Sequence, residues 1–415
     1  MADDAQSLLQ ATEFDPLTAE FREDPYAVYG RLRGTPGLVY WEYGDMWVAA
    51  RHSDVVTVLN EPRLRVGAPE EVRERFAAVA PPSLVPLFGT VLYEDPPEHT
   101  RLRALVSRAF TARRVQALAA RAQELVDAAF DQAERSGEME VIADLAYPLP
   151  VVIICELLGV PPEDRDLFRE WASALSGLAD IPVQAEAVEP AARAAEEFYD
   201  YFERLLAKRP SADEGQDLLS ALRAATVDGS RLTHDELLAM AVLILCSGHE
   251  TIVSLIGNTV LTFIQHPDQL SLLRQRPELV DNAVDEMLRF QSPLQAATGG
   301  GGRWVGESLE LAGTKLPEGE RVLALLGSAN RDPEVFADPD RFDVTRTDIR
   351  AHLAFGHGAH ACFGSALGRL QGAAVVRALV ERPLDLTLLE KEPNWRESFI
   401  LRELTSLPLG VRQAG

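Results

Sequence analysis

The sequence predicts a mainly α-helical fold with small β-sheets, and three observations favour it. Residues 101–265 read mostly as amphipathic helices rich in Ala, Leu, Arg and Glu. The last part of this region, residues 234–265, forms one long and largely apolar helix. Short strand-like runs lie outside it, at residues 38–43, 46–51, 308–326 and 397–411. Helices should therefore form the body of the protein, and the strands should form small peripheral sheets.

The sequence marks both ends of the long helix. Thr233 is followed three residues later by Glu236, which is the pattern of a capping box. His266-Pro267 ends the helix, because proline cannot continue it. At ~1.5 Å per residue, a helix over residues 234–265 is roughly 48 Å long, enough to cross the whole molecule.

The apolar run Leu237–Ile264 is long enough to span a membrane. His249 and Glu250 lie at its centre, where charge is costly in lipid, and Asn258 follows. The flanks carry no basic cluster. The run is therefore predicted to be a buried helix of a soluble protein and not a membrane span.

Composition narrows the class of protein further. With 415 residues, 47% of them hydrophobic, the chain can bury a large core, in two or three domains or in one large domain. Three cysteines, an odd number, favour a reducing compartment over a disulfide framework. The acidic start MADDAQSLLQ lacks the features of a signal peptide, so we expect a cytoplasmic protein. The net charge of −24 argues against nucleic acid as a partner.

The stretch Phe355–Gly364, FGHGAHACFG, places one cysteine in a glycine-rich loop before an apolar helix. Glycine lets the backbone approach a large flat ligand closely. The N–H groups at the start of the helix should stabilise a Cys362 thiolate and lower its pKa. Such a thiolate is a suitable single axial ligand for iron. Zinc requires about four N/S ligands, and no second cysteine lies near.

This loop resembles the haem-thiolate loop of the cytochrome P450 family, F-G-x-G-x-H-x-C-x-G. Every named position is filled, by Phe355, Gly356, Gly358, His360, Cys362 and Gly364. The resemblance implies a single large domain over residues 1–415, with the long helix crossing a haem b that Cys362 binds through its iron. Cys155 and Cys246 are expected to be ordinary buried residues.

Within the long helix, the segment 247–251 (SGHET) places an acid beside an alcohol in an apolar run. Taken alone, it would be a kink with a satisfied polar pair, loosened by its glycine. Beside the cysteine loop, it resembles the family's oxygen-activating motif A-G-x-[DE]-T. The resemblance gives Glu250 and Thr251 the catalytic roles of relaying protons to bound O2, the co-substrate. Ser247 replaces the usual alanine.

Four residues are candidates for holding the haem propionates. His99 and Arg103 lie four residues apart on one helix face and resemble the family's H-x-x-x-R clamp. His360 matches a third contact. Arg303 is the candidate for the fourth, but it follows the four-glycine tract Gly299–Gly302 and lies about four residues later than the resemblance implies.

The resemblance also implies a structural charge network. Glu286 and Arg289 lie three residues apart on a helix and can pair there. Arg341 is expected to complete the network, which would fix the loop behind the cysteine.

The substrate pocket is predicted from the same resemblance to be largely apolar, and it would suit a bulky lipophilic molecule such as a polyketide, terpenoid or steroid. Each candidate could equally be an ordinary core residue. The candidates are Phe88, Val91, Leu92, Leu243, Ile244, Ser247, Leu294, Ala297, Phe399 and Ile400.

The chain is thus identified as a soluble monooxygenase of this family, expected to be a monomer, that hydroxylates or epoxidises a small molecule of secondary metabolism. It carries no flavin or nicotinamide fingerprint. Electrons should therefore come from a separate ferredoxin and ferredoxin reductase. Two alternatives keep the haem: a peroxide-driven peroxygenase or oxidative-coupling enzyme, and a non-catalytic haem protein.

A basic segment stands out on this acidic chain. It has no acid between Glu98 and Glu124, and it contains Arg101, Arg103, Arg108, Arg113, Arg114 and Arg121. The segment is either a docking face for an acidic electron donor or a solvated helix face with one or two internally paired arginines.

Overall fold

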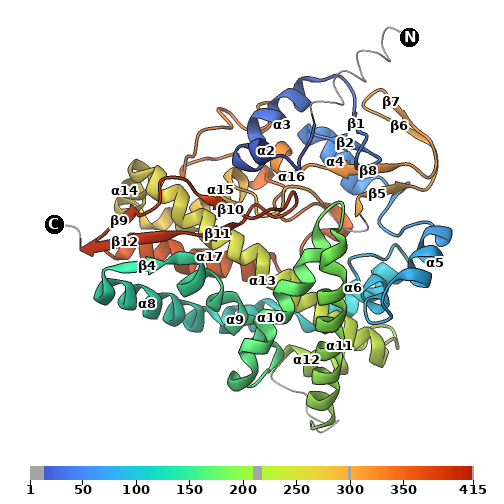
Figure 1. The fold of residues 1–415 in the computed structure, drawn as a ribbon, viewed down its shortest axis with the longest axis horizontal. Coiled ribbons are helices and arrows are strands. Elements are labelled where there is room, and N and C mark those ends of the chain that lie inside the picture. Colours follow the sequence, from blue (N-terminus) through green and yellow to red (C-terminus); the bar gives the residue numbers. More distant parts are fainter. Residues whose placement is uncertain (1–13, 209–216, 298–300, 414–415) are drawn as a thin grey trace.

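One long helix, α13 (His234–Gln265), runs through the middle of the helical body (Figure 1). The computed structural model describes residues 14–208, 217–297 and 301–413. The Thr233 side chain accepts a hydrogen bond from the backbone N–H of Glu236, whose carboxylate accepts from the backbone N–H of Thr233. The predicted capping box and the predicted end before Pro267 are both confirmed, because Pro267 opens the next helix.

Helices enclose α13 along most of its length. It packs against α9 (Pro148–Leu158), α10 (Arg165–Ser176), α11 (Ala185–Ala207) and α17 (Ser365–Glu381). Although α13 is long and apolar enough to cross a membrane, most of its apolar stretch is buried inside the protein. Its apolar side chains therefore belong to the protein core, as the sequence predicted.

Gly248 has a different role from the one its helix-breaking character suggested. The helix is continuous through this residue. A Cβ atom added at Gly248 would lie 3.2 Å from Cδ1 of Ile154 on α9. The glycine therefore allows two helices to approach each other closely, and it does not interrupt the ladder.

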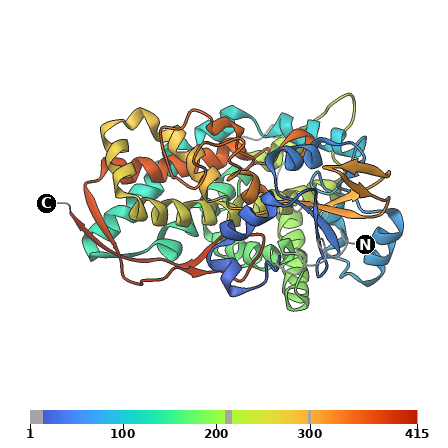
Figure 2. The same cartoon turned by 90° about the horizontal axis from the view of Figure 1, so that it is seen from above.

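The other helices of the described residues surround this core on both sides (Figures 1 and 2). They are α2 (Ala19–Glu23), α3 (Pro25–Gly34), α4 (His52–Asn60), α5 (Glu70–Val79), α6 (Glu98–Ala109), α7 (Ala112–Ala117), α8 (Ala119–Ser136), α12 (Leu218–Ala224), α14 (Pro267–Gln275), α15 (Val280–Phe290) and α16 (Leu326–Ala329). Short single turns include η1 (Val85–Gly89), η2 (Ile142–Ala146), η7 (Ile349–Ala351) and η8 (Gly358–His360).

The strands form small sheets at the periphery, as predicted. The largest has the order β1-β2-β8-β5-β3, and only its β2–β8 pair is parallel, in the register Trp47 to Val322. A second sheet has the order β4-β12-β9, and two hairpin pairs are β6-β7 and β10-β11. The strands are β1 (Val39–Trp41), β2 (Met46–Ala49), β3 (Leu64–Arg65), β4 (Glu138–Glu140), β5 (Arg303–Val305), β6 (Leu309–Leu311), β7 (Thr314–Leu316), β8 (Arg321–Ala324), β9 (Leu384–Leu388), β10 (Asn394–Trp395), β11 (Leu404–Ser406) and β12 (Pro408–Gln413).

An aromatic cluster ties the two ends of the described chain together. The ring of Phe399 lies edge-on to the rings of Phe14, Phe21 and Trp41, at centroid distances of 6.0, 5.9 and 5.7 Å. Edge-to-face aromatic pairs of this kind contribute roughly 0.5–1.5 kcal/mol beyond the area that they bury. The segment that precedes β11 is therefore fixed against the N-terminal helices.

Candidate active site

The cysteine loop is held by its own backbone. The N–H of Cys362 donates to the carbonyl oxygen of Phe355 at 2.8 Å, which closes the loop immediately before α17. Gly356 and Gly358 have φ angles of +68° and +73°, in the left-handed region that favours glycine. A Cβ atom at Gly358 would lie 2.4 Å from Oδ1 of Asn60. The two glycines of the motif are thus required by the backbone conformation, and Gly358 is required also by its neighbours.

Cys362 is accessible at the end of this loop. The surrounding protein still removes much of the water that would stabilise a thiolate, and this desolvation raises the pKa of the thiol above its ordinary value. The N–H groups of Gly364 and Ser365 and the guanidinium group of Arg103 act in the opposite direction, but they do not outweigh burial. The sequence predicted a lowered pKa. That prediction is wrong for the protein alone, because the helix-terminal N–H groups are weaker than the cost of desolvating an anion.

Four donor side chains converge beside this loop, from three separate parts of the chain. The rings of His99 on α6 and His360 on η8 lie 3.9 Å apart, centroid to centroid. Arg103 donates to the carbonyl oxygen of Ala361 at 2.6 Å. Arg303 begins β5 and is buried, and its charge lowers the pKa of both histidines.

The four side chains leave donor capacity unused. Nε2 of His99 is buried without a hydrogen-bond partner in the described residues. Within the same residues, neither Arg103 nor Arg303 forms an ion pair, and burial lowers the pKa of both. Burial and the nearby positive charges lower the pKa of His360 to about 3. A group with two carboxylates, such as a haem with its propionates, would supply the missing negative charge. The residues present therefore fit haem.

The glycine tract before Arg303 lies only partly within the described residues, and Gly299 and Gly300 fall outside them. Gly301 and Gly302 have φ angles of +73° and +106°. A Cβ atom at Gly302 would lie 3.1 Å from the carbonyl oxygen of Val322 on β8. The turn before β5 thus uses glycine to bring Arg303 into the sheet and toward the two histidines.

One stripe of α13 is not covered by other helices. Ser247 is exposed and Leu243 and Thr251 are partly exposed, whereas most of the helix is buried. The hydroxyl of Thr251 donates to the carbonyl oxygen of Ser247 at 3.0 Å, and the hydroxyl of Ser247 donates to that of Leu243 at 2.7 Å. These hydrogen bonds to carbonyl oxygens one helical turn earlier keep both hydroxyls on the open stripe.

The stripe lies close to the cysteine loop. A Cβ atom at Gly368 of α17 would lie 3.3 Å from Cδ1 of Ile252 and 3.5 Å from Cε1 of Phe355. The residue after Thr251 and the first residue of the cysteine motif therefore pack against the same position of α17. The packing of α13 on α17 thereby joins the alcohol-bearing segment to the loop that carries Cys362.

Glu250 faces away from solvent and takes part in a buried polar cluster. Its side chain is 2% exposed. One carboxylate oxygen lies 3.3 Å from Nδ1 of His249, and the other accepts from Nη1 of Arg396 at 2.9 Å. Burial opposes ionisation of Glu250, but the hydrogen bond from His249 and the charge of Arg396 outweigh it and lower the pKa of Glu250. The sequence had singled out Glu250 but not Arg396, which lies 146 residues further on.

The expected structural network is present with one correction. Arg289 donates to Glu286 at 2.7 and 2.9 Å, and both side chains are fully buried. The third member is Arg346, whose Nε lies 3.1 Å from Glu286. The prediction of Arg341 is wrong, because its side chain is 64% exposed and lies near Asp343. Arg341 contributes only its backbone carbonyl, which accepts from Arg289 and Arg346.

The predicted pocket residues divide into two groups. Those with accessible surface are Phe88, Leu92, Leu243, Ser247, Leu294 and Ala297. The others are buried in the core of this structure, and their place in a substrate pocket stays a prediction; they are Val91, Ile244, Phe399 and Ile400. Phe399 belongs to the aromatic cluster described above. Hydrophobic character cannot separate the two groups, because core and pocket residues are equally apolar.

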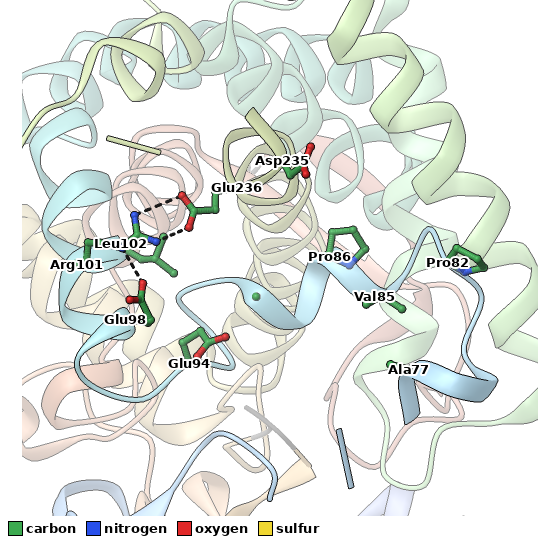
Figure 3. Close-up of a pocket in the computed structure, with 11 residues that line it drawn as sticks. Ala77, Pro82, Val85, Pro86, Glu94, Glu98, Arg101, Leu102, Asp235 and Glu236 are labelled. Atoms are coloured by element: carbon green, nitrogen blue, oxygen red, sulfur yellow. Dashed lines mark hydrogen bonds and ion pairs between the residues drawn. The ribbon is translucent and has the colours of Figure 1, made fainter. Parts of the chain in front are cut away.

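A cavity of the described residues lies elsewhere (Figure 3). It has a volume of about 630 Å³ and opens between α5, η1 and the N-terminal ends of α6 and α13. Arg101 forms part of its wall and pairs with both Glu98 and Glu236. No predicted pocket residue lines it. This cavity and the open stripe of α13 are therefore distinct features.

Comparison with known proteins identifies the arrangement. A model of the family described as Cytochrome P450 matches residues 271–394. The monooxygenase PikC of Streptomyces venezuelae is 42% identical over 406 residues, covering 96% of this chain and 93% of that protein. The 6-deoxyerythronolide B hydroxylase of Saccharopolyspora erythraea is 37% identical, covering 94% and 96%. The solved structure of cytochrome P450 CYP109Q5 from Chondromyces apiculatus is 33% identical, with a TM-score of 0.84 and coverage of 97% and 98%.

Proposed function

This chain belongs to the cytochrome P450 family, and from that premise we propose that it hydroxylates or epoxidises a bulky apolar small molecule of secondary metabolism. Membership makes it a monooxygenase that uses haem b and consumes O2. When bound, the haem supplies reduction and cleavage of O2, which amino-acid side chains do not provide. We infer that residues 1–415 act together as one domain.

The open stripe of α13 carries the proposal. Most of this helix is buried, yet it leaves an alcohol, Thr251, and an aliphatic side chain, Leu243, accessible beside the cysteine loop. Leu92, Leu294 and Ala297 are also accessible and apolar. Together these residues would receive an apolar substrate next to a hydroxyl that can hold a proton. The name of one relative, 6-deoxyerythronolide B hydroxylase, supports hydroxylation of a secondary metabolite by this chain.

We assign roles to the other site residues on the same basis. Cys362 would bind the haem iron, with Phe355, Gly356 and Gly364 shaping its loop. His99, Arg103, Arg303 and His360 would hold the propionates, since they lie together, Nε2 of His99 has no hydrogen-bond partner in the described residues, and neither arginine forms an ion pair there. Glu250 would supply protons toward Thr251. Glu286, Arg289 and Arg346 would hold the segment that precedes the loop, because all three are almost fully buried.

We also propose that a ferredoxin reduces the protein in the cytoplasm by docking on the basic segment. Of the six arginines of this segment, two have side chains that are free to contact a ferredoxin. Arg101 and Arg121 pair with glutamates, and Arg103 and Arg114 donate to backbone carbonyls. Arg108 and Arg113 are exposed and have no ion-pair partner within the described residues. These two charges are available to an acidic partner.

One experiment tests the central proposal. The purified holoprotein would be screened with apolar small molecules for a substrate-induced shift of the haem spectrum. Positive compounds would then be incubated with ferredoxin, ferredoxin reductase, NADPH and oxygen-18-labelled O2. We expect products that carry one labelled oxygen atom. Turnover with peroxide alone, or coupled products without label, would reject the proposed reaction.

A further inference from the structure

We propose that Glu403 is the proton donor that recharges Glu250, and that Arg396 positions the two carboxyl groups for this transfer. The inference rests on the proposed function, because it takes Glu250 as the acid that delivers protons toward Thr251. Glu403 and Arg396 act through Glu250; neither is assigned a contact with substrate or haem.

The geometry brings two carboxyl groups to one guanidinium nitrogen. Nη1 of Arg396 donates to Glu250 at 2.9 Å and to Glu403 at 3.2 Å. The two carboxyl groups therefore share one donor. Two carboxyl groups at one guanidinium can exchange a proton only when one of them is protonated, because a carboxylate has no proton to donate.

Further contacts hold each member of this group in place. The hydroxyl of Ser254 donates to Glu403 at 3.2 Å, and Nη2 of Arg396 donates to Ser176 at 2.9 Å. Ser254 lies one helical turn after Glu250 on α13, and Ser176 ends α10. Three separate segments therefore fix the relative positions of the two acids, as a proton relay requires.

The surrounding charges decide which acid carries the proton. Burial and the negative charge of Glu250 raise the pKa of Glu403 well above its ordinary value, although Arg396 opposes this. The pKa of Glu250 is lowered, as described above. The other titratable groups that face the pair are His249 on α13, Tyr147 at the start of α9, Arg169 on α10 and Cys246 on α13. Two neighbouring acids with opposite shifts are suited to act as donor and acceptor.

The side of this pair that lies nearest to solvent is the Arg396 side. Both glutamate side chains are 2% exposed, whereas that of Arg396 is 21% exposed. A small cavity of about 10 Å³ is lined by Arg396, Ser398, Glu403 and Gln295, among others. A space of this size is at the lower limit for one water molecule, and its lining supplies the polar partners that such a water needs. The relay would thus run from solvent to Glu403 and then to Glu250.

The proton balance of the step is simple. The O–H bond of the Glu403 carboxyl breaks, and an O–H bond forms on the Glu250 carboxylate. Glu250 passes its proton on toward the open stripe of α13, and water reprotonates Glu403. One proton enters and one leaves in each passage through the relay, each turnover needs two such passages, and no electron moves within the relay.

Infrared spectroscopy of the holoprotein tests the assignment directly. We expect a buried protonated-carboxyl band near neutral pH that disappears as the pH rises, shifts in D2O and is absent in Glu403→Gln. The band should persist in Glu140→Gln. This control residue lies on β4, and its carboxylate accepts a hydrogen bond from the backbone N–H of Leu407. A band that persists in Glu403→Gln but is lost in Glu250→Gln would overturn the assignment, as would the absence of any such band.

Kinetic measurements give a second test, because loss of a purely structural residue would not change the solvent isotope effect or the pH profile. In Glu403→Gln, we expect product formation to fall by about 10- to 100-fold, at the lower end of general acid effects, with a larger solvent deuterium isotope effect and an altered pH profile. Substrate-induced spectral shifts should stay unchanged, and Glu403→Asp should restore part of the rate. An unchanged rate and isotope effect would reject the relay. Failure of the wild-type protein to oxygenate any compound would instead reject the proposed function.

Discussion

Arg346 lies 3.1 Å from the Glu286 carboxylate, although only Arg341 carries the sequence signature for that position. The side chain of Arg346 is 6% exposed, and its two terminal nitrogens also donate to the carbonyl oxygens of Ala337, Asp338 and Arg341. The Arg346 guanidinium group thus joins the buried Glu286–Arg289 pair and fixes the loop that follows α15. Arginine suits this role because it offers five donors in a rigid plane.

This relationship predicts unequal effects of two neighbouring arginines. Arg346→Ala should lower the free energy of unfolding by about 3 kcal/mol, because it removes one partner of a buried charge network. Arg341→Ala should change it by less than about 0.5 kcal/mol, since that side chain is exposed. Urea unfolding of the two variants measures both values. Equal destabilisation would contradict the position of Arg346 in the network.

Cys362→Ser should abolish the spectral signature of thiolate-ligated haem. Serine is close in size but is a poor anion at neutral pH, so iron would lose its sulfur ligand. The spectrum of the reduced, CO-bound protein measures the change. Cys155→Ser provides the control, because Cys155 is buried and its raised pKa keeps it a neutral thiol. A thiolate-type spectrum in Cys362→Ser would refute the assignment of the iron ligand.

Gly358→Ala should disturb the cysteine loop more than its backbone angle alone explains. The angle of +73° costs a non-glycine residue about 1–2 kcal/mol, and the new Cβ atom would also meet Asn60 and the carbonyl oxygen of Leu59. Gly229→Ala is a matched control, because Gly229 has a φ of +79° but open space around it. We expect a larger loss of unfolding free energy and of haem content for Gly358→Ala. Similar losses in both variants would show that contacts at Gly358 contribute nothing.

Removal of the two free arginines should slow reduction by ferredoxin. In Arg108→Ala/Arg113→Ala, we expect a lower rate of haem reduction at low ionic strength and a smaller difference at high salt, because charge steering is screened. Substrate-induced spectral shifts should not change. Arg193→Ala on α11 is the control, as its side chain is 67% exposed and, among the residues that the structure describes, pairs with Glu189 alone. Stopped-flow reduction measures the rates, and equal rates in all three proteins would exclude this docking face.

Glu403 should make stability depend on pH in a direction that can be checked. Its folded-state pKa lies above the ordinary value of 4.5, so the folded protein holds this proton more tightly than the unfolded chain does. The stabilising contribution is complete below about pH 4.5 and is lost as the pH rises through the raised folded-state pKa. Glu403→Gln should therefore gain stability relative to the wild type across this interval, by about 1–3 kcal/mol. Urea unfolding at several pH values measures the difference, and a constant difference would contradict the raised pKa.

Local patterns in the sequence predicted several elements correctly. Residues 234–265 form the long helix with both ends as expected, because a capping box and a proline act within one turn of the chain. The cysteine loop was equally recognisable, because glycines of that loop adopt backbone angles that favour glycine. His99 and Arg103 could be paired because they lie one turn apart on one helix.

Other features depend on where distant segments meet. Arg396 and Glu403 carry no pattern that links them to Glu250. The one local signal is that Glu403 lies between leucines of the strand-like run 401–411. Gly248 looked like a helix breaker until Ile154 of α9 was found against it. Phe399 and Ile400 could be assigned to the core only once the N-terminal aromatic cluster was in place.

By itself, the sequence determined the family and the central helix, and it singled out the cysteine that we propose as the iron ligand, because each depends on residues close together in the chain. Only the tertiary structure decided that Arg346 and not Arg341 joins the Glu286–Arg289 pair, and that Glu250 shares its arginine with Glu403. Burial and pairing of charges are set by packing between remote segments, and packing decides both which groups lose water and which partner replaces it.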